Sequence, residues 1–179
     1  MAVSSPSRQP ADARVLVMKF GGTSVADADK IRNVARRLVE AQRRGRRVVG
    51  VVSAMGHSTD TLVALAREVS PRPHPREMDM LLSTGERISA ALTAMAIEDL
   101  GHRAISLTGS QAGIVTDTAH TKAKIVEIRP RRIEEALDRG DIVLVAGFQG
   151  VSTAYDVTTL GRGASDLTAV ALAAALRGD

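Results

Sequence analysis

The sequence contains no cysteine and no tryptophan, and aromatic residues make up only 2% of it. Without cysteine there is no disulfide, no zinc thiolate site and no thiol nucleophile. Because aromatic side chains are so scarce, the core must be filled by alanine, valine, leucine and isoleucine, in line with a hydrophobic content of 44%. A chain of 179 residues is long enough for one ordinary domain with such a core.

Lysine is also scarce, so arginine supplies most of the net charge of +4. A basic chain can indicate a nucleic-acid partner. Here, however, the arginines alternate with acidic residues along predicted helix faces, and two phenylalanines and one tyrosine are too few to stack bases. We therefore expect no nucleic-acid partner.

No apolar run approaches the roughly 18 residues that span a bilayer, so no membrane partner is expected. Residues 1–13 are polar, contain proline and serine, and lack the apolar segment of a secretory signal. They are predicted to form a disordered tail before a domain over 14–179. The expected location is cytoplasmic.

The most informative stretch is the sequence VLVMKFGGTS at residues 15–24. Its apolar first part is typical of a buried strand, and Lys19 lies at the end of that strand. Gly21 and Gly22 allow a tight turn whose N–H groups face an anion, and Thr23 or Ser24 can cap a following helix. A strand end, an amide-lined turn and a helix N-terminus beside a lysine together predict a phosphate site.

Strands and helices alternate along the rest of the chain. Strands are predicted at 15–20, 47–52, 103–107 and 141–146, with a short edge strand at 157–160, and helices at 27–44, 61–69, 77–100, 130–139 and 167–176. This alternation predicts an α/β fold with a parallel sheet. The polar segments that follow the strands, including 108–120 and 147–150, are expected as loops that gather at one sheet edge and form a ligand site.

The sequence has no P-loop, no dinucleotide-binding glycine motif and no nucleophile elbow, and its four histidines lack metal-ligand spacing. No metal site is predicted. Lys19 with the amides of Gly21 and Gly22 can neutralise phosphate, and Arg162 can grip a carboxylate or phosphate through two hydrogen bonds. Glu86 can bind an ammonium group. Phosphoryl transfer needs this kind of positioning and charge neutralisation more than a nucleophilic side chain.

Three features have two interpretations each. Asp166 is either an acid that suits a helix N-terminus or a residue that orients Lys19 or a metal. The glycine-containing segment 83–87 is either a kink between two helices or a break that turns Glu86 toward a ligand. His57 either lines the site or is a solvated loop residue. In addition, Ser165 and Gly178 are expected to cap the last helix.

Five ordered motifs resemble those of the aspartate kinases. They are KFGGTS (19–24), SAMG (53–56), STGERIS (83–89), GFQG (147–150) and TTLGRG (158–163). The resemblance covers the chain from residue 15 to its end. It implies the amino-acid kinase fold, an αβα sandwich with a mainly parallel sheet, and transfer of the γ-phosphate of ATP to the β-carboxylate of L-aspartate, with Mg²⁺ accompanying ATP.

The resemblance also implies roles for individual residues. Lys19 would stabilise the transferring phosphoryl group, and Asp166 would organise that lysine. Glu86 would bind the amino group of aspartate, and Arg162 its α-carboxylate. The remaining residues would be Ser53, Thr59, Phe148 and Ser165 in the aspartate pocket, and Gly21, Gly22 and Ser24 at the phosphates.

The sequence departs from the family pattern in two places. Alanine at position 164 replaces a usual glycine, which is costly if the backbone there has a positive φ. The family also continues beyond the last helix into strands that bind the nucleotide and then into ACT domains, so this chain is expected to be truncated before the nucleotide-binding half, with one sheet edge open. The alternative to an aspartate kinase is a non-catalytic amino-acid-binding or assembly subunit. In both cases we expect a homo-oligomer or a partner chain that supplies the missing half.

Overall fold

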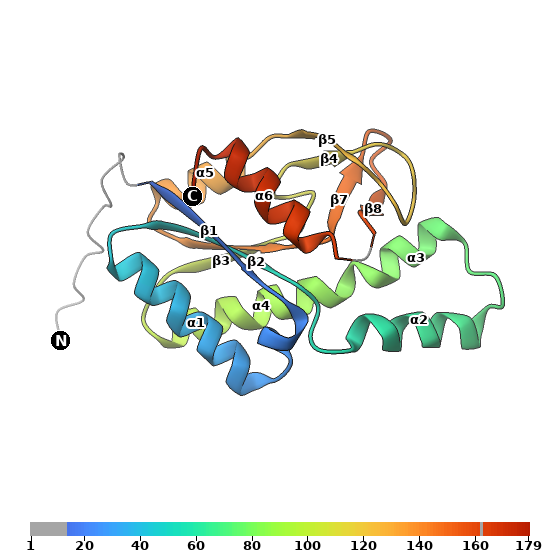
Figure 1. Ribbon diagram of the computed structural model, residues 1–179, viewed down its shortest axis with the longest axis horizontal. Coiled ribbons are helices and arrows are strands. Elements are labelled where there is room, and N and C mark those ends of the chain that lie inside the picture. The colour runs from blue at the N-terminus through green and yellow to red at the C-terminus, as the bar shows by residue number, and fades with distance from the viewer. Residues whose placement is uncertain (1–13, 162) are drawn as a thin grey trace.

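Four parallel strands form the central sheet of the computed structural model, which describes residues 14–161 and 163–179 (Figure 1). The strands are β1 (Val15–Phe20), β2 (Arg47–Val52), β3 (Ala104–Leu107) and β6 (Ile142–Ala146). Their order in the sheet is β1-β2-β6-β3. The four strand predictions are confirmed to within one residue at each end. The tail predicted at 1–13 and the candidate ligand Arg162 lie outside the described residues.

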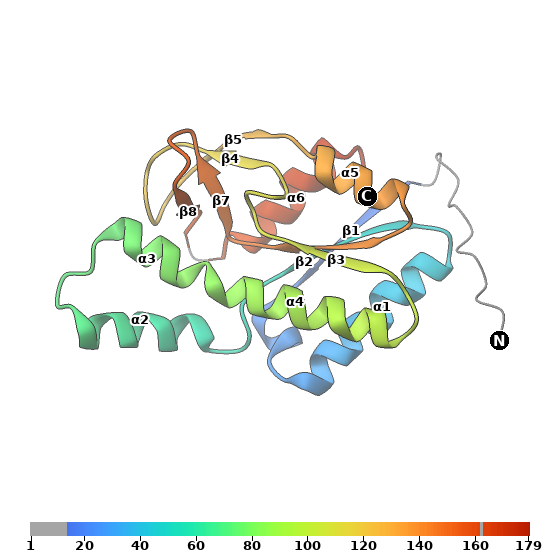
Figure 2. The same cartoon turned by 180° about the vertical axis from the view of Figure 1, so that it is seen from behind.

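Helices cover both faces of this sheet, as Figures 1 and 2 show. The helices are α1 (Ala28–Arg43) and α4 (Thr84–Asp99) on one face, and α5 (Arg131–Asp138) and α6 (Ser165–Ala175) on the other. In β2 the side chains alternate between the two layers: Val48 packs with α1 and α4, whereas Val49 packs with α5 and α6. The predicted αβα sandwich is confirmed.

A second, mixed sheet lies beside the first, and most of it was missed by the sequence analysis. It contains β4 (Ile114–Thr116), β5 (Ile125–Ile128), β7 (Gln149–Ser152) and β8 (Val157–Thr159), in the order β5-β4-β7-β8. The expectation that 108–120 and 147–150 are entirely loop was wrong, because strands of three or four residues among glycines and threonines are too short to show a period. The edge strand predicted at 157–160 is confirmed as β8.

Helices α2 (Ser58–Val69) and α3 (Pro75–Leu82) form an arm that extends past the central sheet (Figure 1). Helix α2 starts three residues earlier than predicted, and none of its residues is buried. Residues 70–74 form neither helix nor strand, and Pro75 begins α3. Proline suits a first helical turn because its missing N–H is not needed there.

Both predicted caps of the last helix were wrong. Ala164 is the residue before α6, and Ser165 is already inside it. The φ of Ala164 is −75°, so alanine is unstrained there. At the other end the positive φ falls on Arg177 rather than Gly178, and the N–H of Gly178 donates to the carbonyl of Ala173 at 2.9 Å. This is the hydrogen bond of a Schellman motif.

The chain then meets the outer edge of β1, which is one of the two edges of the central sheet. One open sheet edge was predicted, without its strand being named. The N–H of Asp179 donates to the carbonyl of Val15, and the N–H of Val17 donates to the carbonyl of Asp179, both at 2.9 Å. This pairing covers the first half of that edge.

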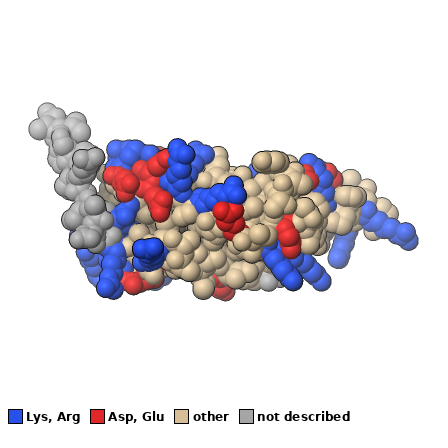
Figure 3. All heavy atoms as spheres, turned by 90° about the horizontal axis from the view of Figure 1, so that it is seen from above, with Lys and Arg blue, Asp and Glu red and all other residues tan. Residues whose placement is uncertain are grey.

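Charges of both signs mingle on the face that carries α5 and β5, which Figure 3 shows from above. Arg131 pairs with Glu135 at 2.7 Å, and Arg129 pairs with Glu127 at 2.6 Å. This face therefore has no field of a single sign. Among the described residues, no helix is long and apolar enough to cross a membrane.

The α1 layer of the core gives a direct stability prediction. Leu38 is fully buried, so Leu38→Ala should lower the free energy of unfolding by about 3 kcal/mol through lost burial and the cavity left behind. Leu92 on α4 is 38% exposed, and Leu92→Ala is the matched control with an expected loss under about 1 kcal/mol. Urea unfolding measures both; equal losses would contradict the burial described here.

Candidate active site

A cavity of about 260 Å³ opens at the carboxyl ends of β1 and β2. It is lined by Lys19, Gly22, Ser53, Ala54, Gly56, Thr59, Asp60, Glu86, Phe148, Gly163 and Ser165. Seven of these were singled out from the sequence, and they come from segments far apart in the chain. A larger groove of about 430 Å³ between α1 and α4 contains none of the predicted site residues. The smaller cavity is therefore the candidate active site.

Of the predicted residues that the structure describes, three are not in the cavity lining. Asp166 stands beside it, paired with Lys19, and a Cβ added at Gly21 would lie 3.5 Å from the Lys19 Nζ. Ser24 lines a separate cavity with Lys30 and Arg37. Arg162 lies outside the described residues.

The sequence analysis missed Ala54, Gly56, Asp60 and Gly163, which also line the cavity. All four had a signal, since each is close in sequence to a predicted site residue. His57 does not line the cavity, and its side chain is 94% exposed. The interpretation of His57 as a solvated loop residue is the one that agrees with this placement.

Lys19 and Asp166 form an ion pair at the mouth of the cavity. Nζ of Lys19 lies 3.1 Å from Oδ1 of Asp166, and the Asp166 side chain is 70% exposed. An ion pair this exposed contributes little to stability. Its effect is to fix the direction of the lysine, because Asp166 is held in the first turn of α6. The two interpretations of Asp166 therefore apply together: it lies at a helix N-terminus, and it contacts Lys19.

Glycines let three segments approach one another beneath the cavity. The N–H of Gly56 donates to the carbonyl of Gly22 at 3.0 Å, and a Cβ at Gly22 would lie 2.8 Å from the carbonyl oxygen of Ala54. A Cβ at Gly85 would lie 2.8 Å from that of Ala54. No side chain fits at either glycine without moving backbone, so the loops after β1 and β2 and the start of α4 pack directly together.

Glu86 is the most unusual group in the cavity. The residue is only 4% exposed, and its Oε1 accepts a hydrogen bond from the N–H of Ala54 at 3.2 Å. Among the described residues, its buried Oε2 has no hydrogen-bond partner. Burial raises the pKa of Glu86 to about 7, against the smaller opposing effect of hydrogen bonds from its own N–H and that of Ala54. A buried carboxylate oxygen without a partner is suited to a cationic ligand.

Segment 83–87 is both a break between two helices and the place where Glu86 turns toward the cavity, so both interpretations of it apply. Helix α3 ends at Leu82 and α4 starts at Thr84, so there is a break between two helices, and Glu86 faces the cavity. The side chain of Gln149 fixes this break. Its Nε2 donates to the carbonyl of Ser83 at 2.8 Å, and its Oε1 accepts from Nε of Arg87 at 3.3 Å.

Phe148 forms the far wall of the cavity in a strained conformation. Its φ is +68°, a region that bulky residues rarely adopt. Its N–H donates to Oγ1 of Thr168 at 3.2 Å, and its carbonyl accepts from the N–H of Leu160 at 2.9 Å. Backbone strain of this kind persists where the surroundings hold it, and it is common at ligand sites.

The parallel sheet between helices has a lysine and a glycine turn at one strand end and a buried carboxylate in the same cavity. These charges suit a small ligand that carries both an anionic group and an ammonium group. The family model described as "Amino acid kinase family" matches residues 14–179. The chain belongs to the amino acid kinase family.

Within that family the sequence is similar to aspartokinases, which confirms the resemblance. The aspartokinase of Mycolicibacterium smegmatis is 64% identical over 166 residues, covering 92% of this chain and 39% of that relative. The crystal structure of aspartate kinase from Synechocystis is 50% identical with a TM-score of 0.78, covering 93% of this chain and 27% of that one. Escherichia coli aspartokinase III in complex with aspartate and ADP is 25% identical with a TM-score of 0.81, covering 92% and 47%.

The chain therefore spans less than half the length of these relatives.

The raised pKa of Glu86 predicts how stability depends on pH. The folded protein holds the proton on this carboxyl more tightly than the unfolded chain does, whose pKa is near 4.5. Raising the pH from 5 to 8 should therefore lower the free energy of unfolding by about 2–3 kcal/mol through Glu86 alone. Glu86→Gln should remove that part of the slope and be the more stable protein at pH 8. Urea unfolding of both proteins at pH 5 and pH 8 measures the difference; parallel pH profiles would contradict it.

Proposed function

We propose that this chain is the amino-acid-binding and phosphate-binding part of an aspartate kinase. The reaction transfers the γ-phosphoryl group of ATP to the β-carboxylate of L-aspartate and gives 4-phospho-L-aspartate, the first step toward lysine, threonine and methionine. The proposal is based on Glu86, which lies in the same cavity as Lys19 and whose buried Oε2 has no hydrogen-bond partner within residues 14–161 and 163–179. An amino acid that receives phosphate needs both an anion for its ammonium group and a cation for the phosphate.

In this proposal the amino acid lies between Glu86 and the segment that precedes α6. Glu86 accepts hydrogen bonds from the ammonium group, and Arg162 binds the α-carboxylate. The remaining pocket residues are Ser53, Thr59, Phe148 and Ser165, all of which line the cavity. Ser53 is held from behind, since its carbonyl accepts from Oγ of Ser89 at 2.6 Å.

The chemical step needs no nucleophile from the protein. An oxygen of the β-carboxylate forms a bond to the γ-phosphorus, the bond from phosphorus to the β,γ-bridging oxygen breaks, and ADP leaves with that electron pair. Lys19 neutralises charge on the phosphoryl oxygens, and Asp166 keeps the lysine aimed at them. The amides of Gly21 and Gly22 are proposed to contact the phosphates. Ser24 is also proposed to contact the phosphates. This role is based only on its motif, since Ser24 lines a different cavity.

Mg²⁺ is proposed to enter with ATP. Within residues 14–161 and 163–179, no three histidine, aspartate or glutamate side chains group closely enough to hold a metal ion. Mg²⁺ commonly keeps its waters and binds through substrate phosphates with one or two carboxylates, which fits a site with the exposed acids Asp60 in its lining and Asp166 beside it. When bound, the ion would neutralise phosphate charge beside Lys19.

Further nucleotide contacts are proposed to come from outside residues 14–179. The relatives are more than twice as long as the region they share with this chain, as the 39% coverage of the Mycolicibacterium smegmatis aspartokinase shows. A partner chain, a second copy or an additional segment would each supply such contacts. We propose that this reaction takes place in the cytoplasm.

Turnover tests the proposal directly. ADP release with L-aspartate, ATP and Mg²⁺ should fall by at least about 100-fold in Lys19→Ala, because a preorganised charge at the phosphoryl group is lost. Lys122→Ala, which removes an exposed lysine, should retain the activity. Turnover of the 179-residue protein that does not exceed that of Lys19→Ala would contradict kinase activity of this chain alone. A melting temperature raised by aspartate but not by ATP would then identify the non-catalytic amino-acid-binding subunit.

Binding of L-aspartate should depend on pH through Glu86. Only the ionised carboxylate attracts an ammonium group, and with a pKa of about 7 the ionised fraction rises from about a tenth at pH 6 to nine tenths at pH 8. The dissociation constant measured by calorimetry should therefore fall about tenfold over this range. Glu86→Gln should bind weakly at both values, with no such trend. A wild-type affinity that is constant from pH 6 to pH 8 would show that Glu86 is not the ammonium ligand.

A further inference from the structure

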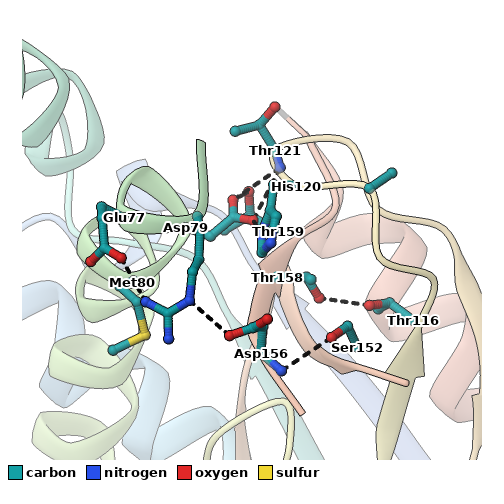
Figure 4. A network of polar contacts seen from close by, with 12 residues as sticks. Glu77, Asp79, Met80, Thr116, His120, Thr121, Ser152, Asp156, Thr158 and Thr159 are labelled. Carbon is teal, nitrogen blue, oxygen red and sulfur yellow. Dashed lines mark hydrogen bonds and ion pairs between the residues drawn. The ribbon is translucent and has the colours of Figure 1, made fainter. Parts of the chain in front are cut away.

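A second buried carboxylate, Asp79 on α3, lies outside the cavity and has no part in the chemistry described above. It is completely buried, and Figure 4 shows it surrounded by hydrogen-bond donors. Oγ1 of Thr159 lies 2.6 Å from its Oδ1, Nδ1 of His120 lies 2.7 Å from its Oδ2, and the N–H of Thr121 donates at 3.1 Å. A buried carboxylate with three donors from two other segments fixes those segments tightly, since separating them would leave it unpaired.

The same helix has a second polar contact with β8, the edge strand of the mixed sheet. Nε of Arg76 lies 2.8 Å from Oδ1 of Asp156, just before β8 begins, whereas Thr159 is its last residue. Figure 4 shows Asp79 beside Thr159, with Asp156 near the other end of β8. Helix α3 thus covers the strand edge and is attached near both ends of the strand.

Thr159 leads directly into the segment that forms one side of the candidate active site. Its carbonyl accepts from the N–H of Ala123 at 2.9 Å, and the next residue, Leu160, donates its N–H to the carbonyl of Phe148. Gly163, four residues after Thr159, lines the cavity, and so does Ser165. The position of this segment therefore depends on how the end of β8 is held.

Helix α3 also leads to the opposite side of the cavity. It ends at Leu82, immediately before the break that turns Glu86 inward. Helix α3 therefore contacts both sides of the cavity. Through Asp79 it holds the segment before α6, and through its C-terminus it leads to Glu86, the carboxylate that is proposed to bind the ammonium group.

We propose that Asp79 and Thr159 form a positioning latch that sets the distance between the two sides of the amino-acid site. The proposal rests on the proposed function, because it assumes that the amino acid is gripped from both sides. The latch touches no ligand. It acts by holding residues 163–166 at the separation from Glu86 at which both ends of an amino acid are bound at once, and small displacements of such groups are costly for binding.

Thr159→Val tests the latch without removing the buried carboxylate. Valine keeps the shape of threonine but cannot donate to Asp79, which retains its contacts with His120 and Thr121. Thr159→Ser restores the hydroxyl. Thr158→Val is the matched control, because the equally buried Thr158 hydroxyl shares a 2.7 Å hydrogen bond with Thr116 and makes no contact with Asp79 in the described structure.

Two measurements are made on each variant: calorimetric affinity for L-aspartate and amide hydrogen exchange over 163–166. Thr159→Val should weaken aspartate binding about tenfold and speed exchange in that segment, whereas Thr159→Ser and Thr158→Val should stay within about twofold of the wild type. Faster exchange in the segment with unchanged affinity would overturn the positioning role. Unchanged exchange in Thr159→Val would overturn the latch, whatever the affinity.

The two proposals fail separately. If the wild-type protein does not bind L-aspartate, the proposed function fails, and positioning of an amino acid by the latch fails with it. If the wild type binds and the three variants all match it, only the latch is overturned. Equal weakening by Thr159→Val and Thr158→Val would also overturn it, since that result indicates a general loss of stability in β8.

Discussion

The close packing of backbone at Gly22, Gly56 and Gly85 is the constraint on which the rest of the site depends. Because no side chain separates these segments, the loops after β1 and β2 and the start of α4 form one rigid floor. That floor gives Glu86 a hydrogen bond from Ala54, and among the described residues its Oε2 has no hydrogen-bond partner. The cost of burying the carboxylate is thus built into the fold, and a cation that enters the cavity relieves it.

The predictable part of the fold was the part with long, uniform patterns. The valines of β2 and the periodic apolar face of α1 each extend over six or more residues, so they identified the central sheet and its covering helices. Most of the mixed sheet was missed because β4, β5 and β7 have only three or four residues each, and their pairing is set by contacts with distant strands. The cap of α6 was wrong for a similar reason: serine has the right chemistry for a cap, but the chain becomes helical one residue earlier.

For the site, strand ends and motifs were sufficient to select most of the cavity lining, because parallel strands bring their carboxyl ends together. The sequence did not reveal the protonation, the backbone conformation or the hydrogen bonds of the residues in and around the cavity. The raised pKa of Glu86, the left-handed backbone of Phe148 and the hydrogen bonds of Gln149 to the helix break all arise from tertiary packing. Asp79 lay in an ordinary amphipathic helix, and nothing in its neighbours along the chain indicated a buried carboxylate with three donors.

The pairing of Asp179 with Val15 and Val17 has a consequence for how the protein is made. Val15 and Asp179 lie at opposite ends of the described chain, so the outer edge of β1 gains this partner only after residue 179 has been synthesised. Contacts between residues so distant in sequence form late, after a large loop has closed. Throughout that interval the outer edge of β1 lacks this partner, and unpaired N–H and carbonyl groups at a strand edge can pair with other chains.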